Sequence, residues 1–264
     1  MLRSLFAGIS GLRVNQTMLD VTGNNIANAN TTGYKASTTV FSDTLSQMLT
    51  AASGQNAERG GTNPVQVGLG VQLAATMTNF NQGSAQTTGR PTDLMIQGDG
   101  FFVVRDGGER LYTRTGAFTF DETGTLVSPS GLRVQDVDGN DITIDMETLQ
   151  SYSIGKDGVI RGIDINGDPW TGPTLAIADF PNPMGLERAG DTTFRVSANS
   201  GDPVIGAAGV AGNGTIMAGA LEMSNVDLAA EFTNLILAQR GFQASSRVIT
   251  TSDQVLEDLV NIKR

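Results

Sequence analysis

The residue types that most enzymes use for catalysis are missing from this chain. Its 264 residues include no Cys and no His. Thiolate nucleophiles, disulfides, Cys-based metal sites and Ser-His triads are therefore excluded. Two carboxylates are enough for glycoside hydrolysis, but no spacing among the Asp and Glu residues singles out a pair. A secreted carbohydrate-active β protein stays open as one hypothesis, and it predicts turnover by a folded monomer.

Two short segments invite a ligand-binding interpretation and fit it poorly. A calcium loop of the EF-hand type needs Gly at position 6 and Glu at position 12. Counted from Asp136, Glu147 stands at position 12, but position 6 is Asp141. The segment 98–100, Gly-Asp-Gly, lacks the Lys and the helix that follow a phosphate-binding loop. We expect a turn at both places, and we expect no cofactor and no metal.

The overall charge of the chain limits the kinds of partner that it can bind. The formal net charge is −10 and no run of basic residues exists, which argues against nucleic-acid binding. No stretch of about 18 apolar residues is present, so we expect no membrane span. The apolar run near the N-terminus is interrupted by Gly8, Gly11 and Arg13, unlike the h-region of a cleaved signal peptide. We expect the protein to leave the cytoplasm by another route.

The two ends of the chain share a heptad pattern. Apolar residues seven positions apart place their side chains on one face of a helix, so each end is expected to need a helical partner. The glycines of the first helix weaken it by about 1 kcal/mol each relative to Ala. The expected coiled-coil residues are Leu5, Ile9, Leu12, Leu19, Ile26, Leu228, Phe232, Leu235, Phe242, Ile249, Leu256 and Leu259.

The middle of the chain has the pattern of a β domain. Short apolar runs about ten residues apart are separated by Gly-, Asn- and Asp-rich turns, which is typical of antiparallel sheets. We also expect a short helix over 40–49 and a helix N-terminus capped by Ser224. The fold class is α+β, with paired terminal helices and a central, mainly antiparallel β domain. The expected divisions are 1–33 (helix), 34–75 (extended connection), 76–222 (β domain) and 223–264 (helix).

Three motifs carry a family resemblance. Residues 19–35, LDVTGNNIANANTTGYK, resemble the N-terminal motif of the bacterial flagellar rod and hook proteins. Residues 88–102, TGRPTDLMIQGDGFF, resemble the central motif of the same family. Residues 224–228, SNVDL, followed by 238–243, AQRGFQ, resemble its C-terminal motif. The three motifs stand in the family's order and span nearly the whole chain.

This resemblance implies a structural subunit and not an enzyme. In the family, terminal helices pair as a coiled coil around a hollow tube and β domains form the outer layers. Implied partners are further copies of the chain, neighbouring rod, hook-cap and hook–filament junction proteins, and the type III export gate. The implied location is the flagellar basal body and hook, outside the cell. A monomeric binding module, which would have stable ends, is a third hypothesis.

The family contains two members of this size. Residues 238–242, 247–253 and 259–264 look more like the C-terminal part of a short hook protein, whereas residues 153–159 are shared with distal rod proteins. We therefore expect a hook subunit, which polymerises into a curved tube and transmits torque as a universal joint. The alternative is the distal rod protein, which forms a straight drive shaft. Phe41 and Leu45 also match the Phe-x-x-x-apolar pattern that the family's early export substrates present to the export gate.

Overall fold

The structure is a computed structural model that describes residues 2–55, 60–210 and 212–262. The chain forms two compact units. Unit 1 comprises Met1–Ala27, Ser37–Thr78 and Asp227–Arg264, and unit 2 comprises Asn28–Ala36 and Asn79–Val226. The helices belong to unit 1 and the larger sheet belongs to unit 2, so the predicted α+β class with helices at both ends is confirmed.

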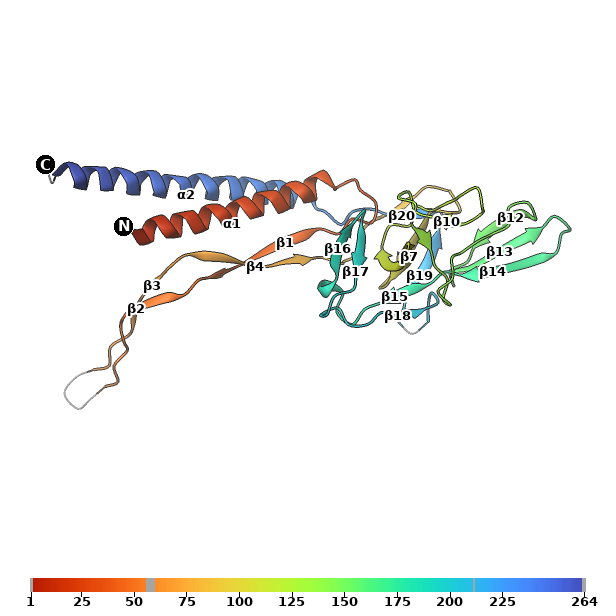
Figure 1. The fold of residues 1–264 in the computed structure, drawn as a ribbon, viewed down its shortest axis with the longest axis horizontal. Helices are drawn as coiled ribbons and strands as arrows, with labels where there is room; N and C mark the ends of the chain where they lie inside the picture. The colour runs from red at the N-terminus through yellow and green to blue at the C-terminus, as the bar shows by residue number, and fades with distance from the viewer. Residues whose placement is uncertain (1, 56–59, 211, 263–264) are drawn as a thin grey trace. The chain divides into compact units, whose positions relative to one another are not determined.

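Unit 1 is built on two helices that run side by side in opposite directions (Figure 1). Helix α1 spans Leu2–Ala27 and α2 spans Leu228–Ile262. The N-cap of α2 is Asp227, whose Oδ1 accepts hydrogen bonds from the N–H groups of Ala229 (2.9 Å) and Ala230 (3.3 Å). The cap expected at Ser224 is therefore wrong, because an acidic side chain three residues later satisfies the free N–H groups of the first turn.

A long two-stranded ribbon completes unit 1. Strand β1 (Ser37–Asp43) pairs antiparallel with β4 (Val71–Thr78), and β2 (Ser46–Thr50) pairs antiparallel with β3 (Val65–Gly68). The short helix expected over 40–49 is wrong, since this segment contributes to both β1 and β2. The local spacing of apolar residues gave no sign of partners some thirty residues away, and pairing with them overrides helix propensity.

Unit 2 is a β domain in which every strand pair is antiparallel. Its main sheet has the order β16-β17-β8-β7-β11-β10-β9, with β15 beside β7 and β18 beside β15. Smaller sheets pair β6 with β19, pair β5 with β20, and join β12, β13 and β14. The strands are β5 (Ala85–Thr87), β6 (Leu94–Gln97), β7 (Phe101–Asp106), β8 (Glu109–Thr113), β9 (Thr119–Phe120), β10 (Leu126–Val127), β11 (Arg133–Val134), β12 (Leu149–Ile154), β13 (Val159–Asp164), β14 (Pro169–Thr174), β15 (Ile177–Asp179), β16 (Glu187–Gly190), β17 (Thr193–Arg195), β18 (Val204–Gly206), β19 (Thr215–Ala218) and β20 (Ala220–Glu222), with one 3₁₀ turn at Pro183–Gly185.

The core of unit 2 has two parts, one on each face of strand β7. Phe102 and Val104 belong to an aliphatic cluster with Leu94, Ile96 and other fully buried residues. The alternate residues of β7, Phe101 and Val103, belong to an aromatic cluster with Phe180 and Phe194. Ring pairs in this second cluster meet edge to face at 4.9–5.8 Å between centroids, a favoured geometry. Burial on both faces explains why β7 reads as a continuous apolar run.

The turn expected at 136–141 is present, and the chain bends at 98–99. At 136–141, the backbone N–H of Gly139 donates to Asp136 O at 3.0 Å. The Asp141 carboxylate, at position 6 of the calcium-loop pattern, accepts from Arg105 at 2.5 Å and from Arg133 at 3.1 Å. Its partners are therefore two guanidinium groups. At 98–100, Gly100 has φ +120°, and a Cβ there would lie 2.4 Å from Ile177 Cγ2.

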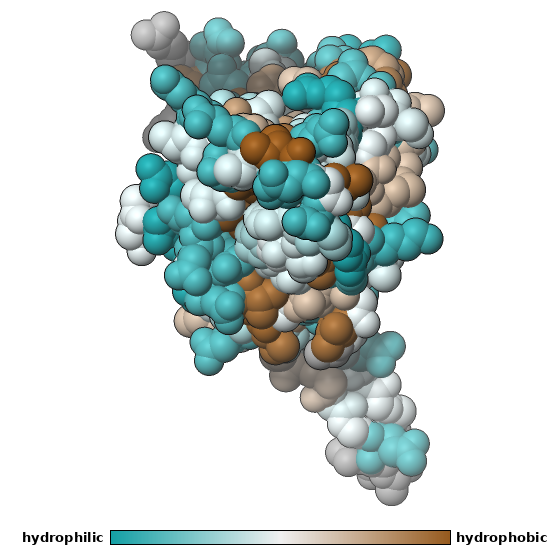
Figure 2. All heavy atoms as spheres, turned by 90° about the vertical axis from the view of Figure 1, so that its right-hand side faces the viewer, coloured by the Kyte–Doolittle hydropathy of each residue, from teal (hydrophilic) through white to brown (hydrophobic). Residues whose placement is uncertain are grey.

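The face of the molecule seen in Figure 2 is mostly polar. Figure 2 shows a face of the molecule on which hydrophilic side chains surround small, separate hydrophobic clusters. Scattered apolar side chains are normal on a soluble domain, and Ile165 (65% exposed) and Met146 (42%) are examples. None of the helices in the described ranges combines the length and apolar character that crossing a bilayer requires.

Candidate functional site

The antiparallel contact between α1 and α2 is made mostly by small and polar residues. Ser4 Oγ and Ser252 Oγ lie 3.3 Å apart near one end of the pair. At the other end, Asn25 Nδ2 donates to Glu231 Oε1 at 3.1 Å. The residue numbers of facing positions therefore add up to about 256 all along the pair.

Glycines let the two helices approach closely. A Cβ added at Gly11 would lie 2.8 Å from Ser245 Oγ, and one added at Gly241 would lie 2.4 Å from Asn15 Oδ1. At Gly8 the nearest atom would be Ile249 Cγ1, at 3.1 Å. From the sequence, the glycines of the first helix were expected only to weaken that helix. Their spacing of three along α1 and the match to Gly241 would have been the signal for a close helix crossing.

The expected coiled-coil residues fall into two groups. Leu5, Leu12, Leu19, Ile26, Leu235, Ile249 and Leu256 are partly buried. The remaining ones are exposed: Ile9 (39%), Leu228 (44%), Phe232 (51%), Phe242 (38%) and Leu259 (48%). A single chain thus leaves much of the predicted stripe uncovered, and the role of these residues in assembly stays a prediction.

A buried polar contact fixes the end of the helix pair. Asn25 Nδ2 donates to Ser37 O at 2.7 Å as well as to Glu231, and Asn25 Oδ1 accepts from the N–H of Ser37 at 3.0 Å. Asn25 is 1% exposed and Glu231 is 8% exposed. Burial raises the pKa of the Glu231 carboxyl above its ordinary value, while the hydrogen bond from Asn25 acts in the opposite direction. One side chain therefore ties α1 to both β1 and α2, and fixes their register as buried polar groups do in coiled coils.

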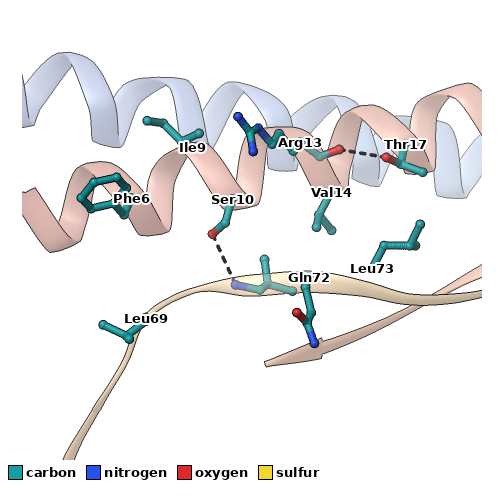
Figure 3. A pocket seen from close by; sticks show the side chains of 10 residues that line it. Phe6, Ile9, Ser10, Arg13, Val14, Thr17, Leu69, Gln72 and Leu73 are labelled. Atoms are coloured by element: carbon teal, nitrogen blue, oxygen red, sulfur yellow. Dashed lines mark hydrogen bonds between the residues drawn. The ribbon is translucent and has the colours of Figure 1, made fainter. Parts of the chain in front are cut away.

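On its other side, α1 faces the ribbon across an open groove (Figure 3). The groove has a volume of about 570 Å³. Its lining residues come from one face of α1 and from the ribbon: Phe6, Ile9, Ser10, Arg13, Val14, Thr17, Leu69, Val71, Gln72 and Leu73. Its side chains are largely apolar, and two of them, Phe6 (65%) and Leu73 (41%), are well exposed. Ser10 Oγ accepts a hydrogen bond from the N–H of Val71 at 3.3 Å, which holds the ribbon against the helix.

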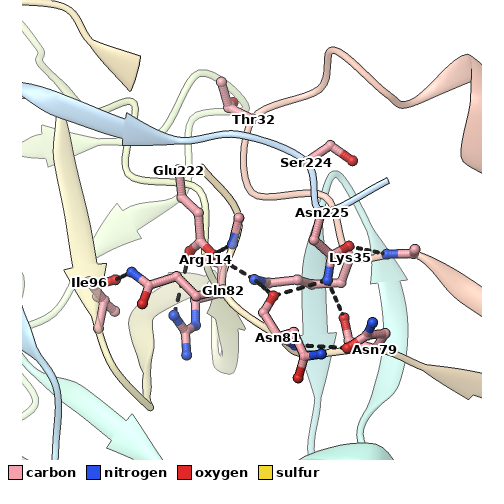
Figure 4. Close-up of polar contacts among 12 residues, drawn as sticks. Thr32, Lys35, Asn79, Asn81, Gln82, Ile96, Arg114, Glu222, Ser224 and Asn225 are labelled. Carbon is pink, nitrogen blue, oxygen red and sulfur yellow. Dashed lines mark hydrogen bonds and ion pairs between the residues drawn. The ribbon is translucent and has the colours of Figure 1, made fainter. Parts of the chain in front are cut away.

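Unit 2 contains a buried charge cluster that the sequence analysis missed (Figure 4). The Lys35 ammonium donates to Glu222 Oε1 at 2.6 Å, and Arg114 Nη1 lies 3.5 Å from Glu222 Oε2. The side chains of Lys35 and Glu222 are completely buried. Burial lowers the pKa of Lys35, although the Glu222 carboxylate acts in the opposite direction. Lys35 closes the N-terminal motif, but only the fold brings it to Glu222.

The same region of unit 2 fixes the segments through which the chain passes to unit 1. Asn225 Oδ1 accepts from the N–H of Ala36 at 2.8 Å, and Asn225 Nδ2 donates to Asn79 O at 2.8 Å and to Asn81 O at 3.0 Å. Lys35 also donates to Asn81 O, at 2.9 Å. Residues 36, 79 and 225 lie at or next to unit boundaries. The polar residues of the N- and C-terminal motifs therefore bind three of the four connecting segments to one another within unit 2.

The residues proposed for export lie in the ribbon of unit 1. Phe41 is partly buried in β1, next to a bulge between Val40 and Phe41. Leu45 lies between β1 and β2 and is 82% exposed. An export role for the pair stays a prediction.

Comparison with known proteins identifies the relationship. Residues 5–35 match the family described as "Flagella basal body rod protein", 95–162 match "Flagellar hook protein FlgE/F/G D1 domain", and 217–262 match "Flagellar basal body rod FlgEFG protein C-terminal". These matches contain Lys35, Arg114 and Glu222, the three charged residues of the buried cluster.

Full-length relatives carry related names. The flagellar basal-body rod protein FlgG of Bacillus subtilis is 46% identical over 265 residues, which cover all of both chains. FlgG of Borreliella burgdorferi is 36% identical over 269 residues, again covering both chains completely. The flagellar hook protein FlgE of Borreliella burgdorferi is 29% identical over an alignment of 441 residues that also covers both chains. The hook relative therefore contains long segments that have no counterpart in this chain.

Proposed function

Because this chain belongs to the flagellar rod and hook protein family, whose members are structural components of the flagellum, we propose that it is a rod subunit of the basal body. The observation that carries the proposal is the end-to-end match to relatives named as rod proteins. With the Bacillus subtilis protein, 264 residues align over 265 positions at 46% identity. The expectation of a hook subunit rested on short C-terminal segments, and it has less support than this full-length similarity.

The hook stays as a second candidate. Relatives named as hook proteins align with the whole of this chain at 28–29% identity. The lower identity and the additional segments of those relatives make the hook the weaker candidate. In both cases the protein acts mechanically, and no step of its function requires a catalytic residue.

In the proposed mechanism, copies of the chain assemble into a tube and the paired helices α1 and α2 line its channel. The close, small-residue contact between the helices makes one stiff rod-like element per subunit. The apolar side chains that one subunit leaves exposed, among them Phe232 and Leu259, are then covered by neighbouring subunits. Each of these side chains is already about half buried, so covering the rest contributes roughly half of the ~1.5–3 kcal/mol of complete burial, which favours assembly over the free monomer.

Epitope labelling of isolated hook–basal bodies tests the choice between rod and hook. The β13–β14 turn at Asn166-Gly167 suits a tag, because a Cβ at Gly167 would meet no atom within 4 Å. The tagged chain is expressed in Bacillus subtilis that lacks its own FlgG. We expect gold label in the straight segment and recovery of swimming. Label confined to the hook, or recovery only in cells that lack the hook protein, would show the hook assignment to be the correct one.

We further propose that Phe41 and Leu45 contact the export gate while the chain is unfolded. Leu45 suits a test, since its exposed side chain adds little to the folded structure. Leu45→Ser is expected to reduce the amount of chain exported at least several-fold, while the purified variant melts at the temperature of the parent protein. Leu49→Ser, at a site that is 54% exposed in β2, is the matched control. Equal export of the two variants would exclude the proposed contact.

A further inference from the structure

The groove between α1 and the ribbon is not filled by the chain's own α2. The residues of α1 that contact α2, such as Gly8, Gly11 and Asn15, differ from those that line the groove. In Figure 3 the ribbon lies on one side of α1 and α2 lies on another. The groove is therefore an open apolar surface formed within unit 1.

One cationic side chain lies among the apolar residues of the groove. Arg13 lines it together with Phe6, Ile9 and Leu69. Within the described part of the chain, no carboxylate forms an ion pair with Arg13. Ile9 is 39% exposed and Leu69 is 38% exposed. An apolar surface with one available cation is complementary to an apolar segment that carries one anion.

The last two turns of α2 have this character. Val255, Leu259 and Ile262 follow one another at helical spacing, so they share one face with Asp258. These apolar residues are 48%, 48% and 81% exposed. The contact of Ser4 with Ser252 marks the position of α1's first turn. Leu259 lies seven residues further along α2, which is about 10 Å at a rise of 1.5 Å per residue, so α1 as described does not cover it.

We propose that the groove of one subunit binds the C-terminal end of α2 from a second copy of the chain, with Asp258 of that copy beside Arg13. The inference rests on the proposed function only in that copies of the chain assemble. It names the contact: Val255, Leu259 and Ile262 cover the exposed parts of Phe6, Ile9, Leu69 and Leu73. The apolar contacts supply the attraction, and the ion pair selects the register, because a charge facing a like charge in a desolvated groove is strongly disfavoured.

Cysteine cross-linking tests this contact directly, since the natural chain has no Cys. An Ile9→Cys chain and a longer, tagged Leu259→Cys chain are purified separately, mixed at high concentration and oxidised. Only a disulfide between two different molecules gives the heterodimer of intermediate length. Phe232→Cys replaces Leu259→Cys in the control, because Phe232 is equally exposed (51%) on the same helix but lies outside the last two turns.

The pair Ile9→Cys and Leu259→Cys is expected to give at least tenfold more heterodimer than the control pair. Arg13→Glu in the first chain should remove most of this excess, and Asp258→Arg in the second chain should restore it. A yield no higher than the control overturns the proposal, as does an excess that the Arg13→Glu change leaves unaltered. Either failure concerns this contact alone, because the place of the protein in rod or hook is decided by the label in the basal body.

Discussion

At the scale of single residues, the most informative group is the Glu231 carboxyl at the end of the helix pair. Its pKa is raised by burial, so between its ordinary value of 4.5 and its raised value the folded state binds more protons than the unfolded state. Stability contributed through Glu231 therefore falls as the pH rises through this window. Burial thus disfavours the charged form of the Glu231 carboxyl in the folded state.

Glu231→Gln is expected to maintain or increase the free energy of unfolding at pH 7, because an amide oxygen can still accept from Asn25. Glu231→Ala should lower it by about 1–3 kcal/mol, since the Asn25 amide loses one of its two acceptors in a buried position. Urea unfolding at pH 7 and pH 5 measures both effects. A Gln variant that is less stable at pH 7 than the parent, or that keeps the parent's pH dependence over this range, would contradict the account.

Lys35, Arg114 and Glu222 make a second prediction at this scale. Glu222→Ala leaves two buried cations without their carboxylate and is expected to destabilise unit 2 by about 3–5 kcal/mol. Lys35→Met should cost less, because Glu222 keeps its contacts with Arg114 and with the N–H of Gly83. Denaturant unfolding of both variants tests this order. Similar losses for the two would mean that packing, and not the uncompensated charge, decides the stability of the cluster.

At the scale of elements, the register of α1 against α2 depends on where glycine is needed. Gly23 and Gly241 form a matched pair, since a Cβ meets nothing within 4 Å at Gly23 but lies 2.4 Å from Asn15 Oδ1 at Gly241. Gly23→Ala is expected to stabilise α1 by about 0.5–1 kcal/mol through helix propensity. Gly241→Ala should give no such stabilisation, because the new Cβ would displace the Asn15 side chain. Thermal unfolding followed by the helical circular dichroism signal measures the difference; an equal gain at both sites would argue against a close crossing.

The elements also show which predictions were accessible from sequence. Both helices follow from apolar spacing and the strands of unit 2 from their Gly- and Asp-rich turns, because these signals lie within about ten residues. The pairing of the ribbon strands was missed. Phe41 in β1 pairs with Leu73 in β4, and the residues near Phe41 in the sequence do not indicate this partner. For the same reason the charge cluster, which joins Lys35 to a residue 187 positions later, could not be found. The heptad pattern identified the helices but not their register, which Gly241, Ser245 and Glu231 set.

At the scale of the whole molecule, the two units differ in how far their apolar residues are buried. Unit 1 presents exposed apolar faces on α2 and beside α1, whereas unit 2 buries most of its large apolar residues in two internal clusters. Such a division suits a subunit whose unit 1 completes its packing only with other copies. Family membership follows from both the motifs and the full-length relatives. The choice of rod over hook comes from overall similarity, because the two kinds of tube differ through contacts between subunits.

Cryo-electron microscopy of hook–basal bodies that contain this chain is the most direct test of the central claim. The account predicts that side-chain density for the sequence fits the straight segment within the cell envelope, with α1 and α2 of each subunit paired antiparallel and Asn25 beside Glu231. Density for this chain only in the curved tube beyond the outermost ring would contradict the rod assignment. Subunits whose two helices are separated in the tube would contradict the proposed role of the helix pair.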